Sequence, residues 1–315
     1  MTILLAIEPE SAIAPWEERM RKLLPGRPLT TPRKLTDRAA IDYALSWRHA
    51  TGALAHLPNL KAIFSLGAGV DHIFSDPLLP EAPVVRVIDK DLTNRMSEWV
   101  VLHALLHLRQ QRLYDRRQAE RHWEEDLAQP AARHVRVGVM GLGVLGGAAA
   151  RKLKALGFKV AGWSRKPRHI RGIACFHGAA ELDPMLAQTD ILVALLPFTD
   201  ETLGILDARL FSKLARDGRL GGPILINAGR GGLHVEKDIV EALDSGLLKA
   251  ASLDVFETEP LPKASPLWRC RNVFITPHCA ALSEPGAVSR AVAAQIKAFE
   301  RGGRLKNVVD RLRGY

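Results

Sequence analysis

The stretch HVRVGVMGLGVLGGAAARKLKALGFKVAGWSRKP, at His134–Pro167, decides the fold. Its first part alternates apolar Val135, Val137 and Val139 with other residues, which predicts a strand, and the run GLGVLG at Gly141–Gly146 follows at once. An amphipathic helical pattern and a second apolar strand come next. This order is typical of a unit that binds a dinucleotide pyrophosphate at the N-terminus of its helix.

The glycines of this run have separate roles in such a turn. Gly141 permits the tight turn, Gly143 lets the backbone approach a pyrophosphate, and Gly146 lets the helix pack closely on its strand. The backbone amides at the start of the helix, those of Val144 and Leu145 among them, then face the phosphates. Glycines also collect in ordinary turns, so the flanking strand and helix carry this prediction.

The end of the second strand indicates which dinucleotide binds. An NAD site usually has Asp or Glu about 20 residues after the glycines, to bond the ribose 2′-hydroxyl. This chain has Ser164, Arg165 and Lys166 there, then Arg168, and no carboxylate. A hydroxyl and a guanidinium suit the 2′-phosphate of NADP, so we expect NADP(H) rather than NAD(H). The alternative is that these cations form an ordinary solvated loop.

Length and composition exclude several classes of protein. The 315 residues suit two domains, and 47% hydrophobic with 25% charged residues is typical of a globular chain. No apolar run approaches the roughly 20 residues of a membrane span. The apolar start, Met1–Ile7, lacks a basic region and meets Glu8 at once, which favours a first strand over a signal peptide.

The cysteines and the net charge indicate the cellular compartment and the kinds of partner to expect. Cys175, Cys270 and Cys279 form neither a CxxC pair nor a metal-ligand spacing, so we expect a reducing, cytoplasmic environment and no bound metal. The net charge is +10, but the basic residues are scattered and no nucleic-acid-binding motif is present. We therefore expect no nucleic acid or membrane as partner, and the charge suits steering of an anionic substrate and cofactor.

Apolar runs elsewhere predict two α/β domains. Before the glycine turn we expect strands at Thr2–Ile7, Tyr43–Trp47, His56–Leu57, Ala62–Leu66 and Val84–Val87, and a helix near Trp16–Leu24. After it we expect strands at Ile191–Leu196, Ile224–Ile226, Ala251–Val255 and Val273–Ile275, joined by helices. A long helix is expected from Met96, and another at Ser289–Arg301 that packs back on the first domain. The predicted fold is a doubly wound parallel-sheet (Rossmann) cofactor domain, residues 100–284, inserted in a smaller flavodoxin-like α/β substrate domain, residues 1–99 plus 285–315.

Polar residues follow these strands at their carboxyl ends, where open parallel sheets bind ligands. The segments are LLPFTDET at Leu195–Thr202, NAGRG at Asn227–Gly231, FETEP at Phe256–Pro260 and TPH at Thr276–His278. We therefore expect a cationic side chain, a carboxylate and an imidazole to lie at the same edge of the sheet. Reduction of a carbonyl beside a nicotinamide requires this set of groups.

Three residues of this edge are candidates for catalysis. Arg230 can grip a carboxylate or polarise a carbonyl through its planar fork. His278 can deliver a proton as a hydride reaches the carbon, and Glu259 would orient the imidazole and favour its protonated form. Taken singly, an arginine after a strand is often a surface ion-pair partner and a histidine is more often structural. Their order after a dinucleotide turn favours the catalytic interpretation.

A second glycine-rich turn, SLGAGVD at Ser65–Asp71, stands between a predicted strand and helix of the first domain. Its backbone N–H groups are placed to receive a carboxylate at a helix start. A plain strand-to-helix turn explains the same residues equally well.

These stretches together resemble the D-isomer-specific 2-hydroxyacid dehydrogenase family over essentially the whole chain. The matching motifs are GLGVLG at Gly141–Gly146, LLP at Leu195–Pro197, NAGRG at Asn227–Gly231, LDVFETEPLP at Leu253–Pro262, SPLW at Ser265–Trp268 and TPHCAA at Thr276–Ala281. Within the family the chain is most similar to the NADPH-using glyoxylate/hydroxypyruvate reductase A group. That likeness comes from DYALSW at Asp42–Trp47, SLGAGVDHI at Ser65–Ile73, WSR at Trp163–Arg165 and VDRLRGY at Val309–Tyr315.

The resemblance implies roles at the matching positions. Arg230 would bind the carboxylate and keto oxygens of the substrate, His278 would donate the proton, and Glu259 would pair with His278. The residues implied at the substrate are Trp47, Ala68, Gly69, Arg230, Trp268 and His278. The residues implied at the cofactor are Gly141, Gly143, Val144, Leu145, Gly146, Ser164, Arg165, Lys166, Leu196, Pro197, Thr202, Ala228, Gly229, Arg230, Asp254, His278 and Ala280.

The resemblance also implies an activity and an assembly. It implies NADPH-dependent reduction of small 2-oxo acids, glyoxylate to glycolate and hydroxypyruvate to D-glycerate, by a homodimer formed through the cofactor domain and Arg109–Trp123. Cys279 and the DKDLTNR loop at Asp89–Arg95 depart from the family pattern. Two alternatives remain: a dehydrogenase of a larger or aromatic 2-oxo acid, and a dinucleotide-sensing, corepressor-like binding protein.

Overall fold

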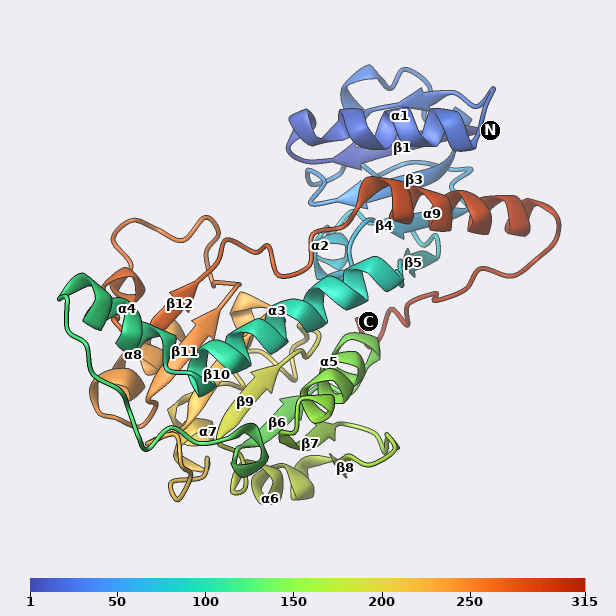
Figure 1. The fold of residues 1–315 in the computed structure, drawn as a ribbon. Coiled ribbons are helices and arrows are strands. Elements are labelled where there is room, and N and C mark those ends of the chain that lie inside the picture. The colour runs from blue at the N-terminus through green and yellow to red at the C-terminus, as the bar shows by residue number, and fades with distance from the viewer. Residues whose placement is uncertain (315) are drawn as a thin grey trace. The chain divides into compact units, whose positions relative to one another are not determined.

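The computed structural model describes residues 1–314, so Tyr315, the last residue of the VDRLRGY motif, lies outside the described residues. The chain forms two compact units (Figure 1). One contains Met1–Leu92 and the residues from Leu282 onward, and the other is Thr93–Ala281. From the sequence we expected divisions at residues 99/100 and 284/285.

The first unit is built on a five-stranded parallel sheet with the order β2-β1-β3-β4-β5. This is the flavodoxin-like order, as expected. Its strands are β1 (Thr2–Ile7), β2 (Leu29–Thr30), β3 (Ile41–Trp47), β4 (Ala62–Ser65) and β5 (Val84–Arg86). Its helices are α1 (Ile13–Leu23), α2 (Asp71–Phe74), α9 (Pro285–Glu300) and the short 3-10 turns Glu10–Ala12, Pro32–Lys34 and Arg38–Ala40.

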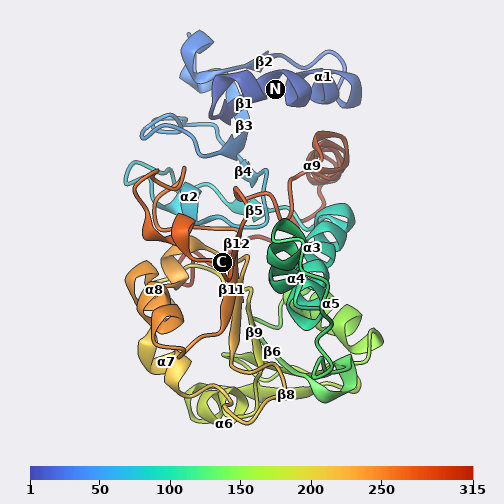
Figure 2. The same cartoon turned by 60° about the vertical axis from the view of Figure 1, so that its left-hand side comes forward.

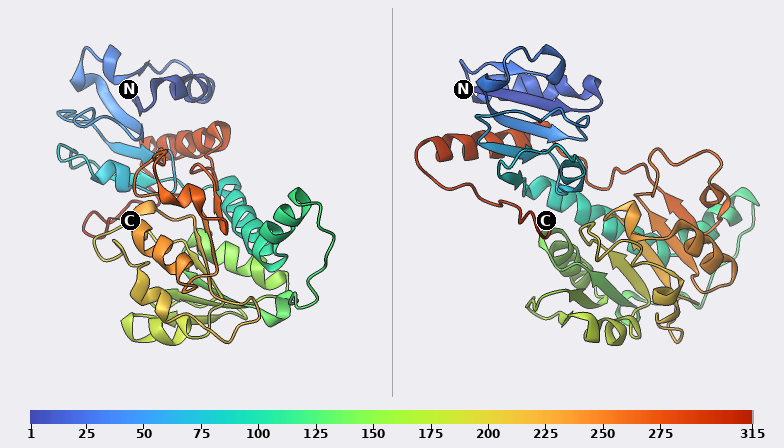
Figure 3. Two further views of the ribbon diagram at one scale, coloured as in Figure 1. Left: turned by 90° about the vertical axis from the view of Figure 1, so that its left-hand side faces the viewer. Right: turned by 180° about the vertical axis from the view of Figure 1, so that it is seen from behind.

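Both faces of this sheet are buried, as parallel sheets require. Alternate residues of β1 divide between the faces: Ile3 and Leu5 pack with α1 and α9, while Leu4 packs on the opposite side with Leu54 and Ile73. Helix α9 therefore completes a core that the start of the chain began, and Figure 3 shows α1 and α9 on the same side of the strands. The first unit is discontinuous in sequence.

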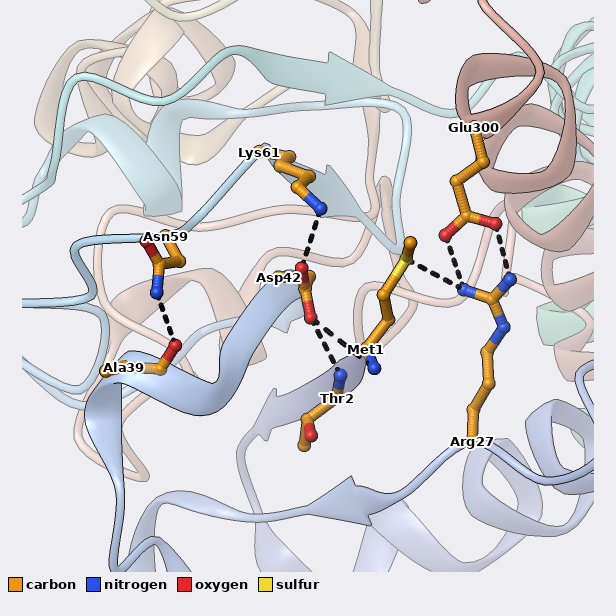
Figure 4. Close-up of polar contacts among 8 residues, drawn as sticks. All are labelled: Met1, Thr2, Arg27, Ala39, Asp42, Asn59, Lys61 and Glu300. Carbon is orange, nitrogen blue, oxygen red and sulfur yellow. Dashed lines mark hydrogen bonds and ion pairs between the residues drawn. The ribbon is translucent and has the colours of Figure 1, made fainter.

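Polar contacts join these distant segments of the first unit (Figure 4). Glu300, at the end of α9, forms a two-pronged ion pair with Arg27, in which one bond is 2.5 Å long. Asp42, at the start of β3, accepts hydrogen bonds from the Thr2 amide at 2.9 Å and from Lys61 Nζ at 2.7 Å. Glu300 thus ties the end of α9 to the segment between α1 and β2, and Asp42 ties the start of β3 to β1 and to the residue before β4.

The second unit has a seven-stranded parallel sheet with the order β12-β11-β10-β9-β6-β7-β8. Counted from β6, this is the Rossmann order 3-2-1-4-5-6 with one more strand, which confirms the predicted fold class. Its strands are β6 (Arg136–Met140), β7 (Lys159–Ser164), β8 (Ala174–His177), β9 (Ile191–Ala194), β10 (Ile224–Asn227), β11 (Ala250–Leu253) and β12 (Val273–Ile275).

Helices cover both faces of this sheet. They are α3 (Lys90–Leu108), α4 (Gln111–Ala119), α5 (Val144–Ala155), α6 (Leu182–Leu186), α7 (Ala208–Ser212), α8 (Glu236–Asp244) and the 3-10 turns Ala132–His134, Ala179–Glu181, Gly231–Leu233 and Pro266–Arg269. Figure 2 shows α3 and α5 on one side of the sheet and α7 and α8 on the other, and the two apolar clusters divide in the same way. Among the described helices, none is both long and apolar enough to cross a membrane.

A polar group is buried where α3 packs on the sheet. The hydroxyl of Ser252, in β11, lies 2.8 Å from His103 Nδ1 and 2.8 Å from His107 Nε2. Both rings meet Phe274 edge-on, and Trp99 stacks on His103 with ring centroids 3.9 Å apart. Burial lowers the pKa of His103 to about 4 and that of His107 to about 3, so both rings are neutral near pH 7.

Some predicted elements were misplaced, for identifiable reasons. His56–Leu57 lies in a turn rather than a strand, because His56 has a φ of +53°. Helix α3 starts before Met96, because the Asp89 carboxylate accepts from the Leu92 amide at 2.9 Å and caps an earlier first turn. Helix α9 likewise starts at Pro285, where the Glu284 carboxylate accepts from two first-turn amides.

Candidate active site

The parallel order of the seven-stranded sheet places the segments that follow its strands along one edge. Strand β6 lies between β7 and β9, so the glycine turn after β6 has the loops after β7 and β9 as its neighbours. On the far side of β9, the segments after β10, β11 and β12 follow in order. Most of the candidate residues predicted from the sequence occupy this edge.

The glycine turn has the space that a dinucleotide needs. A Cβ at Gly141, whose φ is +102°, would lie 2.5 Å from the Leu195 carbonyl oxygen, and one at Gly146 would lie 1.9 Å from that of Gly141. A Cβ at Gly143 would meet nothing within 4 Å, so this backbone faces open space. Helix α5 begins at Val144 without a side-chain cap, which leaves its first-turn amides to an anion. The turn therefore fits a pyrophosphate.

The end of β7 carries the cationic group expected to select the dinucleotide. Ser164 Oγ donates to the Lys166 carbonyl oxygen at 2.8 Å and so holds the loop. Arg165 and Lys166 are exposed. The Nη1 atom of Arg165 lies 2.5 Å from Oε2 of Glu201, which belongs to the loop after β9. The residue pattern Ser-Arg-Lys did not reveal this partner, because the two residues are brought together only by the fold.

The loop after β9 is closed by one hydroxyl group. Thr202 Oγ1 donates to the Pro197 carbonyl oxygen at 2.8 Å and accepts from the Thr199 amide at 2.9 Å. The side chain of Leu196 is buried, whereas Pro197 is exposed at the sheet edge. Ala228 and Ala280, also predicted at the cofactor, are buried in the apolar core of the unit.

The NAGRG segment after β10 is organised by Asn227, which is fully buried. Its side-chain amide donates to the Arg230 carbonyl oxygen at 3.0 Å, and its side-chain oxygen accepts from the Gly229 amide at 3.0 Å. A Cβ at Gly231 would lie 1.8 Å from the carbonyl oxygen of Phe256, so the segments after β10 and β11 are in close backbone contact. The half-buried Arg230 donates to the Gly229 carbonyl oxygen at 2.8 Å.

Glu259 and His278 form a hydrogen-bonded pair. The two carboxylate oxygens lie 2.8 Å and 3.1 Å from His278 Nδ1, and the side chains are 19% and 29% exposed. One of these oxygens also accepts from the Phe256 amide at 3.2 Å. Glu259 thus holds the imidazole ring through Nδ1, which leaves Nε2 as the ring nitrogen that this carboxylate does not contact.

Asp254 fixes the backbone that carries His278. Its buried carboxylate accepts from Thr276 Oγ1 at 2.6 Å and from the amides of Cys279 and Ala280 at 2.9 Å each. Burial raises the pKa of Asp254, while these hydrogen bonds oppose the rise. The His278 amide donates to the Asp254 carbonyl oxygen at 2.7 Å, and His278 has a φ of +51°. Asp254 thus holds the turn in which the imidazole stands.

The other candidate substrate residues lie in two places. Trp47 ends β3 of the first unit, and a Cβ at Gly67 would lie 2.4 Å from its ring. The turn that contains Ala68 and Gly69 is held by Ser65 Oγ, which donates to the Gly69 carbonyl oxygen at 2.8 Å. Trp268 belongs to the second unit, is 52% exposed, and donates from Nε1 to the Pro262 carbonyl oxygen at 3.0 Å.

Comparisons with known proteins show the family to which the chain belongs. The family model described as "D-isomer specific 2-hydroxyacid dehydrogenase, NAD binding domain" matches residues 101–280. The chain is 40% identical over 306 residues to glyoxylate/hydroxypyruvate reductase A of Serratia proteamaculans, with 95% of this chain and 96% of that protein covered.

The chain is also similar to solved structures over nearly its whole length. A probable 2-hydroxyacid dehydrogenase from Rhizobium etli, in complex with NADP, is 48% identical with a TM-score of 0.93 and covers 100% of this chain and 99% of its own. The NADPH-dependent glyoxylate/hydroxypyruvate reductase from Sinorhizobium meliloti, in complex with NADP and sulfate, is 49% identical with a TM-score of 0.93 and the same coverage. Since motif order, sheet order and sequence identity agree over nearly the whole length, the chain belongs to the family of D-isomer-specific 2-hydroxyacid dehydrogenases.

Proposed function

We propose that the protein reduces small 2-oxo acids with NADPH, converting glyoxylate to glycolate and hydroxypyruvate to D-glycerate. The observation that carries the proposal is the Glu259–His278 pair, which stands on the same sheet edge as Arg230 and the glycine turn. The names of the similar reductases from Serratia and Sinorhizobium support the choice of substrates. The NADP-bound relatives support the choice of cofactor.

The cofactor would lie along the sheet edge. NADPH, when bound, supplies the hydride. The open backbone at Gly143 and the amides of Val144 and Leu145 would hold the pyrophosphate. Ser164, Arg165 and Lys166 would hold the 2′-phosphate, because a hydroxyl and two cations replace the acid of an NAD site.

The reacting acid would be held and protonated by side chains of this chain. The planar fork of Arg230 binds the carboxylate and the keto oxygen, and stabilises negative charge on that oxygen as it develops. His278 gives its Nε2 proton to the same oxygen, while Glu259 holds the ring at Nδ1 and stabilises the imidazolium before transfer. We assign the amides of Ala68 and Gly69 to the substrate carboxylate, and Trp47 and Trp268 to contacts with the substrate.

The first experiment measures oxidation of NADPH and NADH with glyoxylate, hydroxypyruvate and phenylpyruvate. The expected result is rapid loss of NADPH with either small acid, with glycolate formed from glyoxylate and D-glycerate from hydroxypyruvate. Faster reaction with phenylpyruvate would replace the substrate assignment, and tight NADPH binding without any turnover would favour a sensor. The Arg230→Ala variant should lose about 10²–10³ in kcat, since it removes a charge that faces the developing oxyanion.

The assembly proposed is a homodimer in the cytoplasm. Exposed apolar side chains lie on α3 and in the segment after α4: Leu102 on α3 is 52% exposed, and Trp123 and Leu127 after α4 are 101% and 88% exposed. A second copy of this chain would cover them, and three free cysteines suit a reducing compartment. Sedimentation of the native protein should give twice the chain mass, and Trp123→Ser should shift it toward one chain. A native monomer would exclude this arrangement.

A further inference from the structure

The ion pair between Arg165 and Glu201 joins two loops that flank the glycine turn. Arg165 follows β7 and Glu201 follows β9, and β6 lies between these strands. The Nη1–Oε2 distance is 2.5 Å, and the side chains are 38% and 66% exposed. The contact therefore lies over the region where the phosphates of a dinucleotide are expected.

The backbone holds Glu201 in place for this contact. Its neighbour Thr202 closes the loop with hydrogen bonds to Pro197 and Thr199, and the Leu203 amide donates to the Thr199 carbonyl oxygen at 2.9 Å. On the other side, β7 is paired with both β6 and β8 up to the loop. The carboxylate is thus presented to Arg165 by an ordered turn.

We propose that Glu201 is a specificity-determining residue: its carboxylate occupies Arg165 before the cofactor binds and must give way to the 2′-phosphate of NADPH. The inference rests on the proposed role of Arg165 in binding that phosphate. A carboxylate and a doubly charged phosphate that share one guanidinium repel each other, and the original ion pair is weakened when the phosphate arrives. NADH carries a neutral 2′-hydroxyl and meets neither effect. Glu201 therefore reduces the preference for NADPH over NADH.

The expected size follows from the exposure of the pair. An exposed ion pair and a repulsion between exposed charges each change a binding constant only a few-fold. Removal of the Glu201 charge should therefore lower the Kd for NADPH about three- to tenfold. NADH binding should change less than about twofold. Salt screens interactions between exposed charges, so the gain in NADPH affinity should shrink as the salt concentration is raised from roughly 0.05 M to roughly 0.5 M.

The test compares Glu201→Gln with Asp200→Asn by titrating the substrate-free enzyme with NADPH and with NADH, using nicotinamide fluorescence. Asp200 is the adjacent exposed acid, so its variant removes the same charge from the same loop but leaves the ion pair intact. The expected result is a lower Kd for NADPH in Glu201→Gln alone. Equal effects of both variants, or weaker NADPH binding in Glu201→Gln, would overturn the proposal.

A third variant separates this proposal from the assignment beneath it. Arg165→Gln should lose most of the preference for NADPH, and adding Glu201→Gln to it should have no further effect, because the shared partner is gone. If Arg165→Gln keeps the full preference, the role assigned to Arg165 is wrong and the inference falls with it. If Arg165→Gln loses the preference while Glu201→Gln changes nothing, only the inference about Glu201 is wrong.

Discussion

The buried histidines of α3 should make the stability of the second unit depend on pH. His103 and His107 are 3% and 7% exposed and share the hydroxyl of Ser252. This hydroxyl can donate only to a ring nitrogen that carries no proton, so at least one of the two rings must be neutral for both hydrogen bonds to form. Burial is the main cause of their lowered pKa values, and the guanidinium of Arg112, which stacks 4.1 Å from the Phe274 ring centroid, adds to it.

The direction of the change in stability with pH follows from proton uptake by the two rings in the folded and unfolded states. In the unfolded chain both rings bind protons below a pKa of about 6.5, whereas in the folded unit they do so only near pH 4 and pH 3. Stability is therefore complete above about pH 6.5 and is lost as the pH falls below it. As the pH falls from about 7.5 to about 5.5, the free energy of unfolding should decrease by about 1.4 kcal/mol for each ring, or by about 3 kcal/mol for the pair.

The measurement is urea unfolding at these pH values, with hydrogen exchange of the β11 amides (Ala250–Leu253) as the readout of this unit. The variant His103→Asn with His107→Gln places a non-titrating amide nitrogen near Nδ1 and Nε2. It should be less stable at high pH but lose about 3 kcal/mol less on acidification. His169→Gln, at an exposed site, is the control and should behave as the wild type. Equal losses in the double variant and the wild type would refute the assignment.

Three further changes test the site and the fold. Glu259→Gln keeps a hydrogen bond to His278 but removes the charge, so kcat should fall about 10²–10³ with the Kd of NADPH unchanged; an unaltered kcat in steady-state assays would remove Glu259 from catalysis. Gly143→Ala should keep the melting temperature of the wild type but weaken NADPH binding, because its Cβ would meet no protein atom. Gly146→Ala should lower the melting temperature and also weaken NADPH binding, because its Cβ would lie 1.9 Å from a backbone oxygen; equal thermal stability of the two variants would contradict this. Glu300→Gln should destabilise the first unit by about 1 kcal/mol in urea titrations, because the two-pronged contact with the 22%-exposed Arg27 loses its charge. Glu241→Gln, at an exposed position of α8, should have no such effect.

Much of the fold could be predicted from periodicity. The alternation in β6 and the glycines after it locate the Rossmann sheet, because such a turn requires a strand before it and a helix after it. Strands β2 and β8 were missed; β2 has only two residues, Leu29–Thr30, which are too few to show a periodicity. The residues of β8, Ala174–His177, are exposed at both ends of the strand and carry no apolar alternation that could mark it.

The candidate site was predictable as a set of segments but not as a set of contacts. Because parallel strands end at one edge, the residues after β10, β11 and β12 could be grouped from the order of the apolar runs. The bonds that Asn227 makes within the NAGRG turn and the bond between Arg165 and Glu201 depend on side-chain geometry, which no spacing rule encodes. The NAGRG motif contained Asn227 without showing that it positions the backbone of Arg230. The catalytic roles themselves stay predictions.

The discontinuous first unit has a consequence for synthesis of the protein. Residues Thr93–Ala281 form a contiguous unit that can close its own core while the chain is still being made. The first unit cannot complete its core until the end of the chain is made, because Val288, Val292 and Ile296 of α9 are part of the core that surrounds β1. Until those residues leave the ribosome, α1 alone covers that apolar face of the first sheet, and the part that α9 will cover stays exposed. The earliest strand translated is therefore among the last to be fully buried, and the waiting period is when this protein is most exposed to aggregation and to chaperones.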